Sequence, residues 1–577
     1  MRSALRSSLG HALAPWIGAA AILGLYAAIG LATRPLTPVD ETRYATVAWE
    51  MWLRGDFLVP YLDGAPYPHK PPLLFWLITA GWSLFGVGET WPRLLPALFA
   101  LAALGLLRRL ARELGPECPE IARSVPALLL ASLAFPALAT FLAFDMLLTV
   151  WVLLGALGVA RAWRRGGAGG WILLGLAFGG GVLAKGPVVY LHLLPLALLA
   201  PWWSGGGGAV RAAKGWRWFA PLAAAAAGGM TLSLAWAVPA AIAGGPAYRD
   251  AIFLNQTAGR LVESFQHARP VWWYLPLLPV IFFPLAWWPP FWRGMRAALR
   301  QPRTALARFC LAWALPPFVA FSLISGKQPQ YLLPFVPALV LLVACGLALE
   351  ERVLEVQRRL VGPALGLAAL ALALFVVAAR GEVSGVTLFR PGLVVAAGIA
   401  AAFVAGCAAR CRTNFENARR GLALIGLAVF AGAHTVFAAG LSAAYDVGPM
   451  ARFVAAAEAR GEPVAFLGEY HGRYQFVGRL TRRVEEIRSV EAEAWAARHP
   501  GGWVVDVWET PRFGPAEPEL TTPFKARHAR VWRAAGLRSL APLAGSPTEP
   551  GVNSGPARVS PRSSPAAGTA GGGSALP

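Results

Sequence analysis

Charged residues are scarce in this sequence. Of its 577 residues only 14% are charged, whereas 56% are hydrophobic and 24 are Trp. A soluble globular domain has about 25% charged residues, so this composition excludes an ordinary soluble protein. Apolar runs of about 18 or more residues recur along the chain, which is the signal for membrane-spanning helices. The sequence therefore predicts an all-α polytopic membrane protein.

Cysteine is also rare, with 5 residues in the whole chain. They are Cys118, Cys310, Cys345, Cys407 and Cys411. All of them fall in or beside predicted helices, which excludes a disulfide framework in the outward loops or the C-terminal part. Cys407 and Cys411 lie one helical turn apart, but no His or carboxylate joins them. Small-residue packing is the better account of this pair. No motif in the sequence demands a metal, so we expect no metal site and no cofactor.

Acidic residues are outnumbered, since 52 Lys and Arg stand against 30 Asp and Glu, for a net charge of +22. In a soluble protein this excess would indicate nucleic acid as a partner. In a membrane protein it is explained by positive charge in the cytoplasmic loops, so no nucleic acid is expected. The apolar runs predict about thirteen spans. They lie near 13–33, 92–110, 124–142, 146–163, 170–185, 186–203, 218–243, 272–292, 306–325, 331–349, 361–379, 391–409 and 421–444.

The arginines at the span ends predict the orientation of the chain. They gather in segments such as 108–123, 161–165, 293–308 and 410–420. These segments share one membrane side with the N-terminus, and the positive-inside rule makes that side cytoplasmic. An odd number of spans then places the C-terminal part on the outer, extracytoplasmic side of the membrane. The first span is too long for a signal-peptide core and is expected to be retained.

Three regions lie outside the predicted spans. The first outer loop, 34–91, contains two apolar or amphipathic stretches, 42–54 and 73–86. They are too short to span and are expected to form helices at the membrane interface. Residues 446–545 predict a small extracytoplasmic α/β domain, with helices at 449–460 and 488–499 and strands at 463–468 and 502–509. Residues 546–577 are rich in Pro, Gly, Ser and Ala and predict a disordered tail. The transmembrane domain is expected to cover residues 1–445.

Ionisable residues gather at the outer ends of these spans, and charges at a membrane boundary indicate function. Two or three carboxylates beside several cations suit a phosphate-bearing lipid, because cations offset the charge of a phosphate and a carboxylate accepts a proton. The carboxylates are Asp40, Glu41 and Asp145, the cations Lys70, Lys185, Arg260 and Lys327, and Arg43, Tyr44, His69 and Tyr331 accompany them.

Structural roles compete with each of these assignments. Asp40 follows Pro38 and would suit a helix N-cap, and Glu41 would favour the dipole of the same helix. Asp145 would also serve as a cap, and Lys70, Lys185 and Lys327 as residues that snorkel to the interface. Tyr331 fits an aromatic belt. For Arg260, the case for function depends on its sequence context, and His267 is expected to be structural.

Five ordered blocks resemble bacterial polyprenyl-phosphate-sugar glycosyltransferases of the protein mannosyltransferase superfamily, and most of all the lipid A aminoarabinose transferases. The blocks are PVDETRYATVAWEMWLRGDFLVPYLDGAPYPHKPPLLFWL (38–77), FLAFDMLLT (141–149), GVLAKGPVVYLHLLP (181–195), FLNQTAGRLVESFQHARPVWWYLPLLP (253–279) and SGKQPQYLLPFVPAL (325–339). The first and fourth blocks are fairly specific, and the five blocks follow one another in order along the first 340 residues. The C-terminal part matches only in its placement.

The resemblance implies a GT-C fold and an undecaprenyl-phosphate-sugar type of donor. Asp40 is similar to the family's catalytic aspartate, and Asp145 to a second acidic position. Lys70, Arg260 and Tyr331 match positions that bind the donor phosphate. One residue departs from the pattern: the aminoarabinose enzymes tend to have Glu where this chain has His69, and a carboxylate is the natural partner for an amine.

These observations predict an inverting glycosyltransferase that moves a sugar from a polyprenyl-phosphate donor to an envelope acceptor, such as lipid A or another glycan. A protein O-mannosyltransferase-type enzyme is an alternative. A lipid-linked sugar flippase is another, although transporters place charges near the midplane and show internal repeats, which this sequence does not. A scaffold that tethers a periplasmic partner is the third. The sugar and the acceptor stay open.

Overall fold

The computed structural model describes residues 2–205, 214–253, 269–300, 304–349, 360, 362–369, 398, 400, 415–509, 513 and 517–537. Within this part of the chain, eight helices are long and apolar enough to cross a membrane. They are Trp16–Thr33, Thr90–Leu114, Phe144–Arg165, Ala168–Lys185, Trp216–Gly244, Ala305–Leu323, Pro329–Leu349 and Ala418–Ala438. The prediction of an all-α polytopic membrane protein is confirmed, whereas the count of about thirteen spans stays a prediction.

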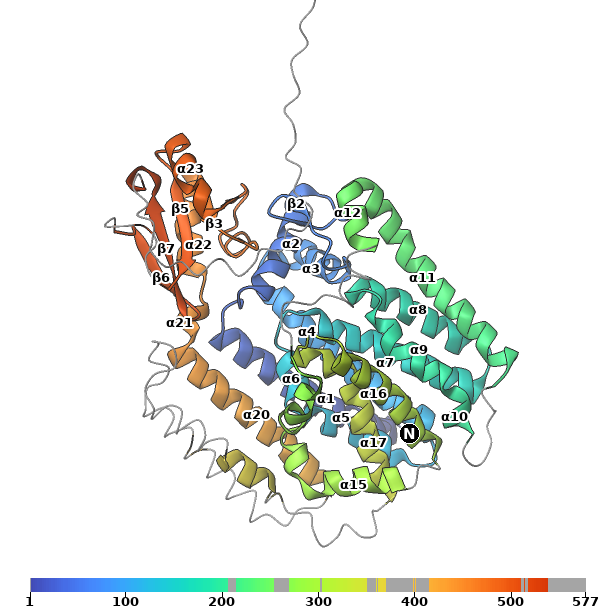
Figure 1. The fold of residues 1–577 in the computed structure, drawn as a ribbon. Helices are drawn as coiled ribbons and strands as arrows, with labels where there is room; N and C mark the ends of the chain where they lie inside the picture. Colours follow the sequence, from blue (N-terminus) through green and yellow to red (C-terminus); the bar gives the residue numbers. More distant parts are fainter. Residues whose placement is uncertain are drawn as a thin grey trace, which may run out of the picture.

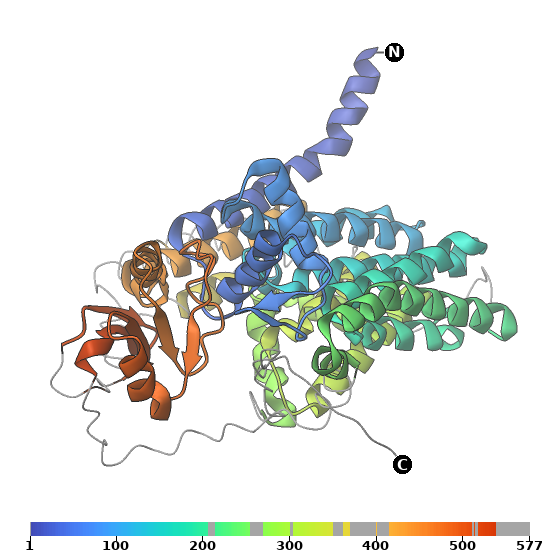
Figure 2. The same ribbon diagram turned by 90° about the horizontal axis from the view of Figure 1, so that it is seen from above.

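The helices form one bundle, which Figure 1 shows below the sheet-containing unit. Seen from above in Figure 2, the N-terminal end of α1 projects beyond the bundle. The longer helices of the bundle are α1 (Arg2–Thr33), α4 (Thr90–Leu114), α7 (Phe144–Arg165), α8 (Ala168–Lys185), α11 (Trp216–Gly244), α16 (Ala305–Leu323), α17 (Val336–Leu349) and α20 (Phe415–Gly440). The shorter ones are α5 (Pro119–Leu130), α6 (Ala134–Leu138), α9 (Val188–Leu198), α10 (Ala200–Ser204), α12 (Pro246–Asp250), α14 (Leu278–Ile281) and α15 (Pro289–Arg300).

Helices α7 and α8 form a tight antiparallel pair. Gly166 and Gly167 both have positive φ angles and make the short turn between them. Such angles favour glycine because it lacks a Cβ atom. A Cβ atom on Gly158 would lie 2.8 Å from the carbonyl oxygen of Gly170, so the two backbones meet where side chains are missing. This pairing brings the start of α7 beside the end of α8.

Two predicted spans are interrupted in the structure. The span predicted at 124–142 is divided into α5 and α6, because the backbone N–H of Leu133 donates to the carbonyl of Phe283, 2.7 Å away, instead of continuing a helix. The span predicted at 272–292 consists of the 3-10 segments η2 (Val271–Leu277) and η3 (Leu285–Trp287) with α14 and the start of α15. Its prolines remove helical donors. Of the predicted spans 361–379 and 391–409, the structure describes residues 362–369, which are helical, and the single residues 398 and 400.

The first loop forms α2 (Asp40–Arg54), the hairpin of β1 (Tyr61–Leu62) and β2 (Ala65–Pro66), and α3 (Leu73–Phe85). The predicted helical stretches 42–54 and 73–86 are therefore confirmed as helices. Their buried faces share one apolar cluster, which contains Tyr44, Val47, Phe75 and Trp82 and reaches Phe144 at the start of α7. Because of this packing, the start of α2 and the start of α7 lie in one core.

The C-terminal unit is a five-stranded sheet in the order β4-β3-β5-β7-β6. Its strands are β3 (Val464–Leu467), β4 (Glu485–Ile487), β5 (Trp503–Trp508), β6 (Leu520–Phe524) and β7 (Arg527–Arg533). β3 pairs in parallel with β4 and β5, and β7 pairs antiparallel with β5 and β6. Helix α22 (Gly448–Ala459) covers one face and α23 (Ala492–Arg498) the other, since their side chains join separate apolar clusters. The predicted helices and strands of an α/β unit are confirmed.

This unit is fixed to the first loop as well as to α20, which α21 (Ser442–Tyr445) follows. The Thr46 hydroxyl donates to the carbonyl of Gly472 over 2.7 Å, and the Trp49 indole donates to Leu480 over 2.9 Å. The ring of Phe476 stacks on Trp82 at a centroid separation of 5.2 Å. The α/β unit therefore stands over the same end of the bundle as α2 and α3 (Figure 1).

Candidate active site

Helix α2 begins at Asp40, directly after Pro38 and Val39. The N-cap is Val39, which makes no side-chain capping bond, so Asp40 is not an N-cap. Asp40 and Glu41 both lie in the first turn, where carboxylates stabilise the positive end of the helix dipole. Successive helical residues point about 100° apart. The two neighbouring carboxylates therefore enter different surroundings.

The Asp40 carboxylate lies at the surface, with 57% of its side chain exposed. It forms an ion pair with Arg43, one turn further along α2, and the Tyr44 hydroxyl lies 3.5 Å from the same carboxylate oxygen. Burial opposes the charged form of Arg43, but Tyr67, Tyr44 and Asp40 outweigh it and raise its pKa. Burial, Asp40 and Tyr67 raise the pKa of Tyr44 well above its ordinary value. Asp40 is thus an accessible carboxylate beside a permanent cation.

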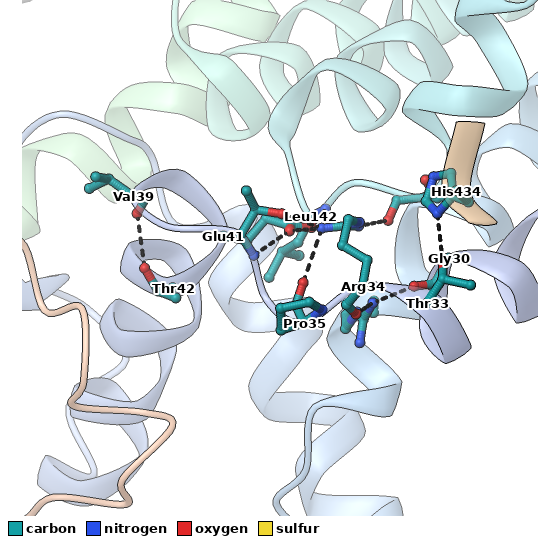
Figure 3. Close-up of polar contacts among 12 residues, drawn as sticks. Gly30, Thr33, Arg34, Pro35, Val39, Glu41, Thr42, Leu142 and His434 are labelled. Atoms are coloured by element: carbon teal, nitrogen blue, oxygen red, sulfur yellow. Dashed lines mark hydrogen bonds and ion pairs between the residues drawn. The ribbon is translucent and has the colours of Figure 1, made fainter. Parts of the chain in front are cut away.

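The Glu41 carboxylate is buried. Figure 3 shows its polar contacts with Arg34 and Leu142. Both of its oxygens accept from the Arg34 guanidinium, and they also accept from the backbone N–H groups of Thr37 and Leu142, each over 2.8 Å. Arg34 donates in addition to the carbonyl of Thr140 over 2.7 Å. Glu41 therefore ties the end of α1 and the start of α2 to the segment that leads into α7.

Lys70 follows the β1–β2 hairpin in the first loop, and its side chain lies near the same apolar core. Its ammonium nitrogen is 5.5 Å from the centre of the Phe144 ring, and that ring meets Tyr44 edge-on at a centroid distance of 4.8 Å. His69 packs against the buried Tyr67, with ring centroids 5.2 Å apart. The loop thus brings Lys70 to the residue that precedes Asp145.

Asp145 and Lys185 form a buried ion pair between the first turn of α7 and the end of α8. Their side chains are 8% and 12% exposed. The Lys185 ammonium also lies 4.9 Å from the centre of the Tyr331 ring, which belongs to η4 (Pro329–Phe335). Asp145 is close enough to Tyr44 to contribute to the raised pKa of that phenol. Asp145, Lys185 and Tyr331 are therefore brought together, near Lys70 and Tyr44.

Lys327 is described by the structure but is not part of this group. The Lys327 ammonium is almost completely buried and donates to the backbone carbonyls of Arg269 and Ile324, so its bonds hold the turn before η4. Arg260 and His267 lie outside the described residues. Their assignments, like the functional roles of the other predicted site residues, stay predictions.

Sequence reasoning missed the partners that come from distant segments. Arg34 was visible only as a cation at the end of the first span, and nothing near it in the sequence identifies Glu41 as its partner. Lys525 sits at the tip of the β6–β7 hairpin with φ 54°. Burial and nearby Arg473 lower its pKa, whereas Asp40 acts to raise it, so the α/β unit brings the Lys525 ammonium toward Asp40.

Comparison with known proteins gives three concordant matches. Residues 69–207 match the family described as dolichyl-phosphate-mannose-protein mannosyltransferase. The undecaprenyl phosphate-alpha-4-amino-4-deoxy-L-arabinose arabinosyl transferase of Edwardsiella ictaluri is 34% identical over 351 residues, which are 58% of this chain and 59% of that protein. The enzyme of the same name from Pseudomonas aeruginosa strain UCBPP-PA14 is 34% identical over 344 residues, or 57% and 58% of the two chains. The chain thus matches about six tenths of the length of these curated relatives.

The solved structures extend the likeness to almost the whole chain. ArnT from Cupriavidus metallidurans bound to undecaprenyl phosphate superposes with a TM-score of 0.69 at 19% identity, over 91% of this chain and 98% of that one. Its apo form gives a TM-score of 0.71 at 20% identity, over 92% and 99%. The sequence matches confirm the resemblance to polyprenyl-phosphate-sugar glycosyltransferases. The superpositions show the fold, and the protein is a multi-pass membrane protein with the GT-C fold of ArnT.

Proposed function

We propose that this protein is an integral-membrane glycosyltransferase that moves a sugar from a polyprenyl-phosphate donor to an envelope acceptor, such as lipid A or another glycan. The observation that supports the proposal is the gathering of Asp40, Lys70 and the Asp145–Lys185 pair at one end of the bundle. An accessible carboxylate and several cations at a membrane surface match the needs of a lipid phosphate leaving group. The identity to the two arabinosyl transferases favours the same class of donor.

In the proposed reaction an acceptor oxygen attacks the anomeric carbon of the sugar, on the face opposite the lipid phosphate. The bond between that carbon and the phosphate oxygen breaks, and the configuration inverts. Lys70 and Arg260 offset the charge that builds on the departing phosphate, and Tyr331 donates a hydrogen bond to it. Asp40 accepts the proton of a hydroxyl acceptor, or positions an acceptor that is already ionised.

Lys185 and Glu41 have supporting roles in this proposal. Because Lys185 is paired with Asp145 and lies over the Tyr331 ring, it fixes the ring from which the donated hydrogen bond comes. Glu41 acts through its bonds to Arg34, Thr37 and Leu142, which hold Asp40 and the segment before Asp145 in one frame. We assign Glu41 as a positioning residue.

The organisation of the chain follows from the same proposal. We infer that residues 1–445 form a transmembrane glycosyltransferase domain in the bacterial inner membrane. Residues 446–545 form a separate α/β domain. The N-terminus lies in the cytoplasm, and the candidate site and the α/β domain lie in the periplasm. The C-terminal ends of α4 and α7 are rich in Arg, and on α7 this end is the one opposite Asp145. The positive-inside rule places such an end in the cytoplasm, which supports this orientation.

The sugar is the least constrained part of the proposal. His69 stands where the aminoarabinose enzymes tend to have a glutamate, so the chain lacks a carboxylate at that position to pair with an amine. Donors with and without an amino group therefore belong in the same assay, and their relative turnover identifies the sugar.

The test uses the purified protein in detergent with a panel of short-chain polyprenyl-phosphate sugars and envelope extract as the acceptor source. Donor cleavage is followed by mass spectrometry. Asp40→Asn is expected to abolish transfer, because the amide cannot accept a proton. The matched control is Asp250→Asn, which removes an aspartate of similar exposure that also pairs with a neighbouring arginine, Arg249. Normal turnover by Asp40→Asn would refute the role of Asp40, and donor binding without cleavage by the wild type would favour a flippase.

A further inference from the structure

A second charged cluster lies at the other end of the bundle from the candidate site. It is a pocket of about 280 Å³ between the last turns of α4 and α7. Its charged lining consists of Arg109, Arg112 and Glu113 from α4, and Arg161, Arg164 and Arg165 from α7.

The length of α7 separates this pocket from Asp145. Arg161 and Arg165 follow Asp145 by 16 and 20 positions along the helix, and at 1.5 Å per residue this separation is roughly 24–30 Å. That distance is about the thickness of the hydrocarbon core of a bilayer. The pocket therefore lies at the opposite membrane surface and takes no part in the proposed transfer.

The pocket is built around one buried carboxylate. The Glu113 side chain is 7% exposed, and it binds Arg165 through a two-pronged contact of 2.6 and 2.7 Å. The Arg161 Nε atom lies 3.7 Å from the same carboxylate. Glu113 thus holds two guanidinium groups of α7 against α4, which gives the wall a fixed shape.

The positive charge of the lining exceeds what its acidic groups neutralise. Five arginines stand against Glu113, and within the described part of the chain the one further acidic partner is the exposed Glu117, 3.3 Å from Arg164. Arg109 and Arg112 are exposed and have no ion-pair partner among the described residues. Scattered loop arginines are enough to satisfy the positive-inside rule. Here they converge on one hollow, which indicates an anionic ligand.

We propose that this pocket binds the phosphate headgroup of an anionic phospholipid. Guanidinium groups match phosphate oxygens in geometry as well as charge, and basic pockets between transmembrane helices recognise anionic headgroups. The volume is below the range of about 300–1,000 Å³ typical of sites for drug-sized ligands, so it fits a headgroup better than a complete lipid-linked sugar. The place at the membrane surface favours a lipid over a free anion. Nearby, Arg108 lies 5.3 Å from the Trp16 ring, an interfacial type of contact.

The test is a lipid titration of the purified protein followed by native mass spectrometry. Phosphatidylglycerol is expected to bind at least tenfold more tightly than phosphatidylcholine, and its binding to weaken when salt is raised from 50 to 500 mM, because the contacts are electrostatic. The variant Arg109→Gln/Arg112→Gln removes the two arginines without ion pairs, and it is expected to bind phosphatidylglycerol at least tenfold more weakly. The matched control is Arg296→Gln/Arg300→Gln on α15, which removes two exposed arginines on the same predicted side and is expected to change binding less than twofold.

Three results would overturn the proposal. Equal binding of the two lipids would exclude headgroup recognition, and equal losses in the two arginine pairs would show non-specific attraction to a basic surface. If inorganic phosphate at millimolar concentration displaces phosphatidylglycerol completely, the ligand is a free anion. The comparison of the two lipids and the salt series need only the wild-type protein, so the proposal stays testable if the pocket variant does not fold.

Discussion

At the scale of single residues, variants of the Asp145–Lys185 pair allow its contribution to stability to be measured separately from its contribution to catalysis. Because both side chains are almost buried, removal of one charge leaves the other without compensation, at a cost of about 3–5 kcal/mol. Asp145→Asn and Lys185→Met are each expected to lower the thermal unfolding midpoint. The double variant is expected to regain most of the midpoint, because neither charge is left.

Transfer activity provides the second measurement for this pair. If Lys185 orients Tyr331 toward the donor phosphate, the double variant stays inactive although its stability returns. A double variant that recovers both properties would make the pair a structural contact only. Losses of stability that simply add would show that the two charges do not interact.

Asp63 predicts a dependence of stability on pH. Burial and the neighbouring carboxylates Glu50 and Glu486 raise its pKa to about 8, although Arg483 opposes them. In an unfolded chain the same group titrates near a pKa of about 3.9. Between these values the folded protein retains a proton that the unfolded chain has released, so the free energy of unfolding falls as the pH rises from about 4 to about 8.

Asp63→Asn is expected to abolish this fall in the free energy of unfolding with pH, since the amide stays neutral. Asparagine also tolerates the positive φ of 54° at this turn. At pH 8 the gain is on the order of 5 kcal/mol, since the two pKa values differ by about 4 units. The measurement is the thermal unfolding midpoint of the detergent-solubilised protein from pH 5 to 8.5, with the exposed Glu517→Gln as control. A variant whose midpoint declines with pH as steeply as that of the wild type would contradict the assignment.

At the scale of elements, the start of α2 sets the position of Asp40. Glu41→Gln leaves the buried Arg34 without its counter-charge and weakens the bonds to Thr37 and Leu142. Misplacement of a catalytic group by about 1 Å can lower a rate about 100-fold. We expect kcat to fall by about that factor while the Kd of the donor changes only a few-fold.

The control for this prediction lies on the same helix. Glu50 is also a buried carboxylate that accepts two backbone N–H groups, from Asp63 and Gly64, but it holds the β1–β2 hairpin and not the start of α2. Glu50→Gln is expected to lower stability and to leave kcat within a few-fold of the wild type. Similar losses of kcat in both variants would show a general loosening of the loop.

The sequence predicted elements better than it predicted partners. The start of α2 follows from Pro38 and the Asp40–Glu41 pair, and strand β5 follows from the run GWVVDVWE, because these signals are local. The break between α5 and α6 was missed, since it depends on a bond between Leu133 and Phe283, far apart in the chain. Of the candidate site, the residue types and their common end of the bundle were predictable. That Glu41 would be buried with Arg34 was not, because this pair forms only when α1, α2 and α7 have packed.

At the scale of the whole molecule, the candidate site and the arginine pocket lie at opposite ends of the same helices, so their membrane sides depend on each other. The chain reaches the candidate site at the start of α7 and at the end of α8, and it reaches the arginine pocket at the other ends of α4 and α7. The α/β unit contacts α2, so it lies on the side of the candidate site. One measurement of orientation therefore fixes the membrane side of both sites.

Fusions of alkaline phosphatase, an enzyme that is active only in the periplasm, supply this measurement. A fusion after residue 545 is expected to be active, because it places the enzyme behind the α/β unit, and a fusion after Gly167, in the turn between α7 and α8, is expected to be inactive. Green fluorescent protein at the same two positions should give the opposite pattern, since it is fluorescent in the cytoplasm. Active phosphatase at Gly167 and inactive phosphatase at residue 545 would show that the topology is the reverse of the proposed one. The arginines around Glu113 would then face the periplasm, against the positive-inside rule, and the proposed donor would have to be reached from the cytoplasm.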